Sequence, residues 1–331
     1  MKKVTILALD GASATTITGP MDVFTNAGVL WNKIFGQSVF PFFEVEIATI
    51  SGKPIICNNN LPLQPHTAIR DITQTDLIIV PAVFNIENSL AKHGNTVIPW
   101  LIGHYEQGAH LASICTGSFV LALTGLLNGR EATTHWAVAE EFRQLYPKVI
   151  LKPEKLITDA GDIFCSGSFS SCIDLAMYLV EKYCGHQVAV ECSKALAHDM
   201  GRFSQAPYMP FRFQRNHKDD AVLRCQHFLE EQFPEEIDIE VLAGRNGMGR
   251  RTMERRFKAA TGDTPLSYLQ RVRVEQAKKM LESGRETFDE ISYKVGYEDS
   301  SFFRRVFRKY TGLKPTEYRG KFQRIINMSD S

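Results

Sequence analysis

Arginine side chains recur in two segments of this 331-residue chain, which repeat one pattern fifty positions apart. Residues 253–268 align with residues 303–318, and Arg255 falls on Arg305. A guanidinium can donate two parallel hydrogen bonds to the edge of a guanine, so arginines on one helix face have the chemistry to read DNA bases. Such a repeat indicates one supersecondary unit used twice. The alignment also pairs Phe257 with Phe307, Thr261 with Thr311, Gly262 with Gly312, Pro265 with Pro315 and Tyr268 with Tyr318.

Each copy has the pattern of a helix, a tight turn containing glycine, and a second helix. Met253 and Phe257 lie four positions apart, as do Phe303 and Phe307, and should pack on the preceding helix. The opposite face of the second helix is then free to enter a major groove. The alternative is a solvated arginine-rich surface, which the matched turns and Gly-x-x-Pro exits of the two copies disfavour. The candidate base contacts are Arg251, Glu254, Arg255, Ser300, Ser301, Arg304 and Arg305, the candidate phosphate contacts are Lys258, Arg308 and Lys309, and Arg250 is a further candidate DNA contact.

A cysteine, Cys115, stands between a predicted strand over residues 110–114 and a predicted helix that begins at Gly117. This is the layout of a nucleophile elbow, which holds a side chain above a strand end and beside the amides of a helix N-terminus. Such amides lower the pKa of a thiol and form a pocket for an anion. The alternative is a structural Cys115, since cysteine is among the most buried residue types.

Length and charge together indicate two domains with different partners. A chain of 331 residues is too long for one ordinary core. Residues 1–196 carry 13 basic and 17 acidic residues, a net charge of −4, whereas residues 221–322 carry 20 and 16, a net charge of +4. The second domain is therefore the candidate for a polyanionic partner. Residues 197–220 have no clear period and are expected to form a linker, and residues 323–331 a tail.

The seven cysteines are an odd number and form no Cys-x-x-Cys pair, which argues against a disulfide framework. We therefore expect a reduced, cytoplasmic setting. The N-terminal Met-Lys-Lys segment lacks the apolar core of a signal peptide, and no apolar run approaches a membrane span. No metal or cofactor site is predicted.

Short apolar runs alternate with helical patterns up to about residue 195, which predicts an α/β domain of flavodoxin-like type, a mainly parallel sheet flanked by helices. The expected strands are 4–9, 43–49, 76–80 and 110–114, with two shorter ones near 156–158 and 163–165. The expected helices of this domain are 20–30, 96–107, 117–124, 137–145 and 170–183. The second domain is predicted to be all-α with two helix-turn-helix units, its helices covering 221–233, 239–244, 250–261, 265–283, 288–295 and 300–311.

Residues 221–322 resemble the DNA-binding domain of the AraC/XylS family, in which one long helix, here 265–283, joins two helix-turn-helix units. Residues 296–319 match the family signature almost throughout. The first copy is looser, because Gly249 stands where the family usually has a capping serine. The resemblance implies that both recognition helices enter successive major-groove segments. One chain would then read a bipartite, non-palindromic site in double-stranded DNA.

Residues 110–136 resemble the class I glutamine amidotransferase-like superfamily, in its branch of intracellular protease/amidase-like proteins. In that branch the elbow cysteine and a histidine after a Thr-Thr pair share one pocket, which here would contain Cys115 and His135. Enzymes of the superfamily add a histidine after the cysteine or an acid on the first-strand loop, where this chain has Thr116 and Thr16. The resemblance therefore implies a binding pocket that has lost catalysis. The expected ligand-binding residues are Cys115, Thr116, Gly117, Phe119, His135, Trp136, Ser168 and Phe169.

From end to end the chain resembles GlxA-type transcriptional regulators, which join these two domains. The resemblance implies a homodimeric activator whose N-terminal pocket binds a small effector of amine, betaine or amino acid type, with RNA polymerase as a candidate partner. Phe119, Trp136 and Phe169 have ring faces that suit a cation, although core packing is the favoured alternative for them. Two other interpretations stay open. One is a cysteine-dependent amide or nitrile hydrolase or hydratase that uses Cys115 and His135, and the other is an architectural DNA-binding protein without an effector.

Overall fold

The computed structural model describes residues 1–84 and 86–323, and the chain divides into two compact units at residues 205 and 206. The residues expected to form a linker, 197–220, are shared between these units. Ser204 and Gln205 both donate hydrogen bonds to the carbonyl of Glu154 in the first unit, at 2.8 and 3.0 Å. In the described part of the chain, no helix is long and apolar enough to cross a membrane.

The first unit is built on a seven-stranded sheet with strand order β10-β11-β7-β6-β1-β2-β5. Its neighbouring strands are parallel except for the antiparallel pair β10–β11 at one edge. The strands are β1 (Lys2–Leu7), β2 (Phe43–Thr49), β5 (Thr67–Ala68), β6 (Leu77–Val80), β7 (His110–Ile114), β10 (Ile157–Asp159) and β11 (Ile163–Ser166). Two short ribbons accompany the sheet, β3 (Ile55–Ile56) with β4 (Pro62–Leu63) and β8 (Glu131–Ala132) with β9 (Ile150–Leu151).

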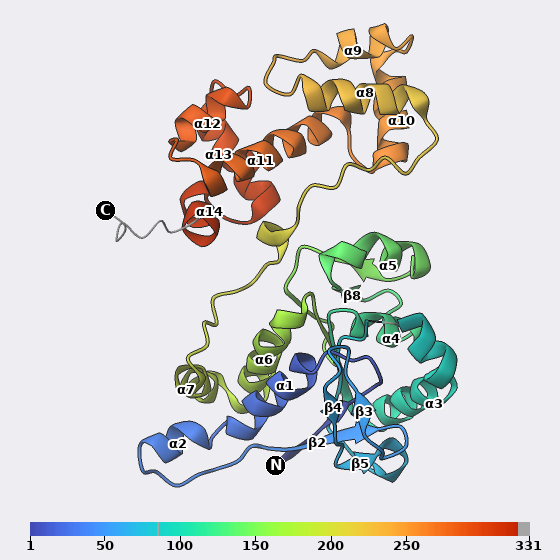
Figure 1. The fold of residues 1–331 in the computed structure, drawn as a ribbon, viewed down its shortest axis with the longest axis vertical. Helices are drawn as coiled ribbons and strands as arrows, with labels where there is room; N and C mark the ends of the chain where they lie inside the picture. Colours follow the sequence, from blue (N-terminus) through green and yellow to red (C-terminus); the bar gives the residue numbers. More distant parts are fainter. Residues whose placement is uncertain (85, 324–331) are drawn as a thin grey trace. The chain divides into compact units, whose positions relative to one another are not determined.

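Helices cover both faces of this sheet, with α1 and α6 on one side and α3 and α4 on the other (Figure 1). Burial on both faces explains why the central strands are continuous apolar runs, as in the Leu77–Val80 strand. The mainly parallel α/β architecture that the sequence predicts is therefore confirmed. The helices are α1 (Thr15–Asn26), α2 (Leu30–Ile34), α3 (Ile86–Glu106), α4 (Gly117–Leu123), α5 (Ala139–Leu145), α6 (Cys172–Cys184) and α7 (His186–Leu196).

The helix predictions for this unit differ from the structure in three places. Helix α1 begins at Thr15 and contains Pro20, where the prediction began the helix. It ends at Asn26, and α2 starts as a separate helix at Leu30. A proline inside a helix removes one backbone hydrogen bond, so it is usually taken as a boundary. Helix α3 begins about ten residues earlier than predicted. Helix α7 was not predicted, although Ala189 and Cys192 on one of its faces are buried.

The second unit is all helical. It consists of α8 (Asp220–Glu231), α9 (Ile239–Arg245), α10 (Arg250–Thr261), α11 (Pro265–Ser283), α12 (Phe288–Lys294), α13 (Ser300–Thr311) and α14 (Pro315–Phe322). The predicted bounds of α10, α11 and α13 agree with the structure, whereas α14 was not predicted. Helix α11 contacts helices of both helix-turn-helix units, and Figure 1 shows it running between them.

Two separate hydrophobic clusters hold this unit, and α11 contributes to both. Its first half places Tyr268, Leu269 and Val272 in a cluster with α8, α9 and α10. Its second half places Ala277 and Leu281 in a cluster with α12, α13 and α14. One continuous helix therefore fixes the separation between the two helix-turn-helix units.

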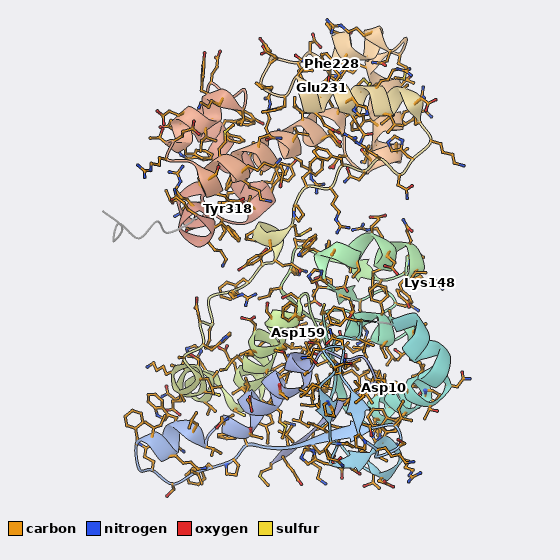
Figure 2. The ribbon with its side chains drawn as sticks, viewed as in Figure 1. Asp10, Lys148, Asp159, Phe228, Glu231 and Tyr318 are labelled. Atoms are coloured by element: carbon orange, nitrogen blue, oxygen red, sulfur yellow. The ribbon has the colours of Figure 1, made fainter. Side chains whose placement is uncertain are left out.

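The repeated residues of the two copies are mostly structural. The Thr261 hydroxyl donates to the Phe257 carbonyl at 2.8 Å, and Thr311 does the same to Phe307 at 2.8 Å. The glycine that follows each threonine ends its helix in the left-handed conformation, with φ of 78° in the first copy and 73° in the second. Each copy then places a proline at the first turn of the next helix and a buried tyrosine behind it, such as Tyr318 (Figure 2).

We expect Gly312→Ala to lower the free energy of unfolding of the second unit by about 1 kcal/mol, because its positive φ is unfavourable for any residue with a Cβ. Gly320→Ala is the matched control. Gly320 lies within α14 with open space around it, so the same change there should raise the stability by roughly 0.5 kcal/mol. Urea unfolding followed by far-ultraviolet circular dichroism measures both. An equal response of the two variants would contradict the capping role.

Candidate functional site

The second helix of the first helix-turn-helix unit, α10, has one buried and one exposed face. Met253 and Phe257 have no exposed surface and belong to the first cluster of the unit. Arg251, Arg255 and Lys258 are exposed. The predicted division of this helix into a packed face and a free face is thus confirmed, while DNA contact by the free face stays a prediction.

Two predicted DNA contacts of α10, Arg250 and Glu254, form an ion pair with each other. The Nε of Arg250 donates to Oε1 of Glu254 at 3.0 Å across one helical turn. Either side chain must leave this pair to reach a base. The helix begins after Gly249, which forms no side-chain cap, as the sequence suggested.

The corresponding helix of the second unit, α13, is better anchored at its N-terminus. Oδ1 of Asp299 accepts hydrogen bonds from the amides of Ser301 and Phe302, at 2.8 and 3.0 Å. Phe303 and Phe307 are fully buried behind the helix. Ser301 is exposed and Ser300 is partly exposed at the same end.

The arginines of α13 lie in different environments. Arg304 donates to Oδ1 of Asp289 on α12 at 2.5 Å, so it is held against the first helix of its own unit. Arg305 is exposed, and its guanidinium lies 5.4 Å from the centre of the Phe302 ring. Arg308 and Lys309 are exposed further along the helix. Of the two predicted arginine base contacts in this helix, Arg305 is the one without a carboxylate partner among the described ion pairs.

A basic groove of about 550 Å³ runs beside α13 and extends the predicted interface. Its lining combines the predicted Arg304, Arg305 and Arg308 with residues of α14 and of the turn before it. Lys314 and Arg319 are the cationic residues that sequence reasoning missed. Both lie within residues 296–319, which match the family signature, but the sequence analysis did not single them out.

The elbow in the first unit has the geometry that the sequence predicted. Cys115 has a φ of 56°, an unusual value for a residue with a side chain, and it connects β7 to α4. Gly117 permits the turn, because a Cβ there would lie 2.5 Å from the carbonyl oxygen of Val80. Thr116 fastens the elbow by donating to the carbonyl of Val83 at 2.8 Å and accepting from its amide at 3.0 Å.

Burial of Cys115 acts against activation of its thiol. Burial raises the pKa of Cys115 to about 11, although hydrogen bonds from the backbone and hydroxyl of Thr116 and from the backbone of Phe169 act to lower it. At neutral pH the sulfur is therefore a protonated thiol, and a thiol is a poor nucleophile. The two backbone groups still form a polar lining beside the sulfur.

His135 takes part in a local turn. Its Nδ1 accepts a hydrogen bond from the amide of Ala137 at 3.1 Å, and its ring centre lies 5.1 Å from that of Trp136. The preceding Thr134 is buried and donates to the carbonyl of Cys115 at 3.2 Å, which links the His135 segment to the elbow. Nδ1 of His135 therefore stabilises the local turn by accepting this hydrogen bond.

The first-strand loop supplies a hydroxyl where related enzymes have an acid. Thr16 is fully buried, donates to the carbonyl of Ser13 at 2.8 Å and accepts from the amide of Ala82 at 3.1 Å. The neighbouring Asp10 accepts from the amide of Ile56 at 3.3 Å. These bonds hold the first-strand loop against the segments that carry Ala82 and Ile56.

The other predicted ligand-binding residues are divided between core and surface. Phe119 is buried and packs edge-on against Phe142, with ring centres 4.9 Å apart, so core packing is the correct interpretation of this residue. Phe169 is half exposed. Ser168 forms a reciprocal capping box with Ser171 before α6. Within residues 1–84 and 86–323, no group of three or more His, Cys, Asp or Glu residues could hold a metal ion.

Comparison with known proteins gives a match for each unit. Residues 2–182 match the DJ-1/PfpI family, and residues 242–321 match a helix-turn-helix domain family. The HTH-type transcriptional regulator CdhR of Pseudomonas aeruginosa is 27% identical over 282 residues, which cover 84% of this chain and 82% of CdhR. Isonitrile hydratase of Pseudomonas putida is 28% identical over 199 residues, which cover 58% of this chain and 78% of the hydratase.

Among solved structures, Drosophila melanogaster DJ-1beta superposes with a TM-score of 0.51 at 19% identity, over 60% of this chain and 98% of DJ-1beta. This likeness concerns the fold alone. CdhR, whose match covers 84% of this chain, is named a transcriptional regulator, whereas the match to the hydratase covers 58% of this chain. The chain belongs to the DJ-1/PfpI family through its first unit, and its second unit is an AraC-type helix-turn-helix domain.

Proposed function

We propose that this protein is an effector-responsive transcriptional regulator that reads a bipartite site in double-stranded DNA. The observation that carries the proposal is the pair of exposed arginine faces, on α10 and α13, that α11 holds at a fixed separation. Arg255 and Arg305 would read bases, and the basic groove beside α13 would hold phosphates. The unlike surroundings of the two helices favour unlike half-sites.

The first unit would supply the signal. Its elbow places a protonated Cys115 beside the backbone groups of Thr116 and Phe169, which suits the binding of a small effector more than nucleophilic chemistry. The effector that we propose is of amine, betaine or amino acid type. We further propose that the protein acts in the cytoplasm as a homodimeric activator. Effector binding would favour one of two arrangements of the protein on DNA.

Arg255→Ala and Arg305→Ala should each weaken binding to the selected site by about 1–3 kcal/mol and relax base preference at one position, because a bidentate contact to a base is lost. Fluorescence anisotropy with the selected site and with random DNA measures the difference. Lys279→Ala removes one positive charge from the exposed surface of α11 and is the control. Equal losses on both DNAs would mean that the arginines contact phosphates only.

The Cys115 thiol should react slowly with iodoacetamide near neutral pH and faster as the pH rises toward about 11, because burial raises its pKa and only the thiolate is alkylated. Mass spectrometry of the native protein, with the urea-unfolded protein as the control for intrinsic reactivity, follows this residue among the seven cysteines. Rapid alkylation at neutral pH, together with turnover of an isonitrile or amide, would instead support the hydratase or hydrolase alternative.

A further inference from the structure

A second cavity, of about 320 Å³, lies in the first unit and shares no lining residue with the elbow. Its walls come from β10, from α6 and from the segment that carries His198 and Arg202. Leu156, Met177 and Phe203 give it apolar surface. A concave site of this size, apolar with a few convergent polar groups, has the character of a small-molecule site.

One carboxylate that lines this cavity, that of Asp174, has an oxygen without a hydrogen bond. Its side chain is 5% exposed, and its Oδ2 has no hydrogen-bond partner. Nε2 of His198 lies 3.3 Å from Oδ1, and Nη1 of Arg202 lies 3.3 Å from Oδ2, so both are within ion-pair range. The contact of Arg202 does not have hydrogen-bond geometry, and Nε2 of His198 also has no hydrogen-bond partner. Nε of Arg202 is likewise buried without a hydrogen-bond partner. A buried carboxylate oxygen without a hydrogen bond is uncommon, so Oδ2 keeps the capacity to accept one from a bound molecule.

The other carboxylates of the cavity are satisfied. Asp159, labelled in Figure 2, accepts from the hydroxyl of Tyr178 at 2.5 Å and from Nζ of Lys182 at 2.9 Å. Glu181 pairs with His186 at 2.8 Å. Three carboxylates thus line a cavity whose own basic residues are Arg202 and His198. The lining carries more acidic than basic side chains, and Oδ2 of Asp174 is its buried carboxylate oxygen without a hydrogen bond.

We propose that this cavity binds a small organic cation, a primary amine or a guanidinium with a short apolar body, whose N–H groups bond Oδ2 of Asp174. The apolar body lies against Met177 and Leu156. Arg202 competes with the cation for Asp174, because both carry the positive charge that the buried carboxylate requires.

Binding at this site has a direct route to the second unit. His198 and Arg202 belong to the segment that ends the first unit at residue 205, and the second unit begins at residue 206. A cation that takes over Asp174 releases this segment from its ion pairs. The effect on DNA binding rests on the proposed function, whereas cation binding itself does not.

Isothermal titration calorimetry of the full chain tests the site with butylamine and butylguanidinium as probes, and with butanol and butyrate as neutral and anionic matches. We expect heat from the two cations only. Asp174→Asn should weaken cation binding by about tenfold, because the buried charge that attracts the cation is lost. Arg202→Gln should strengthen it by roughly threefold, since the internal competitor is removed.

Asp22→Asn, which removes one exposed carboxylate from α1, is the matched control and should bind the cations like the unaltered protein. The opposite changes expected for Asp174→Asn and Arg202→Gln separate a binding role from simple misfolding, which would weaken both variants. Absence of cation binding by the unaltered chain, or unchanged binding by Asp174→Asn, overturns the proposal. Cation binding by a chain that fails to bind DNA would uphold the site and refute the proposed function.

Discussion

The structure of the second unit depends on one constraint, the membership of α11 in two hydrophobic cores. Tyr268 and Val272 belong to the first core, and Ala277 and Leu281 belong to the second. A helix of 19 residues is about 28 Å long, which is close to the roughly 34 Å of one turn of DNA. Bending or breaking this helix would expose apolar surface in both cores at once. Helices α10 and α13 are therefore kept at a fixed separation by the burial of α11 in both cores.

In the first unit, burial and hydrogen bonding at the elbow have opposite effects on the pKa of Cys115. The helix N-terminus and the amide of Phe169 favour a thiolate, but burial of Cys115 outweighs them and raises its pKa to about 11. Thr16 stands where the resemblance led us to expect an acid, and its hydroxyl bonds the backbone of Ser13 and Ala82. The strand-to-helix elbow is thus retained while burial opposes formation of the thiolate, which agrees with the proposed sensor.

Much of this could be predicted because the signals were local. The bounds of α10, α11 and α13 follow from a left-handed glycine at one end and a proline at the next beginning, both of which act within a few residues. The positive φ of Cys115 follows from the strand-to-helix pattern around Gly117.

The rest depended on contacts between distant residues, which spacing does not reveal. The pairing of Arg304 with Asp289 joins two helices, and the cluster of Asp174 with His198 and Arg202 joins α6 to the segment after α7. The high pKa of Cys115 likewise reflects how deeply the fold buries it. The prediction placed this helix at 20–30, whereas α1 covers Thr15–Asn26 and holds Pro20 in its interior, where a proline removes one backbone hydrogen bond.

The most direct test of the account is a spacer experiment on a DNA site selected from a random pool. Binding of the protein is measured after insertion of about half a helical turn, and of about one full turn, between the two recognised segments. A rigid α11 predicts that both insertions abolish the contribution of one segment, because the helix cannot lengthen. Recovery of full affinity with the one-turn insertion would show that the two segments are read by independently tethered parts, and would contradict the account.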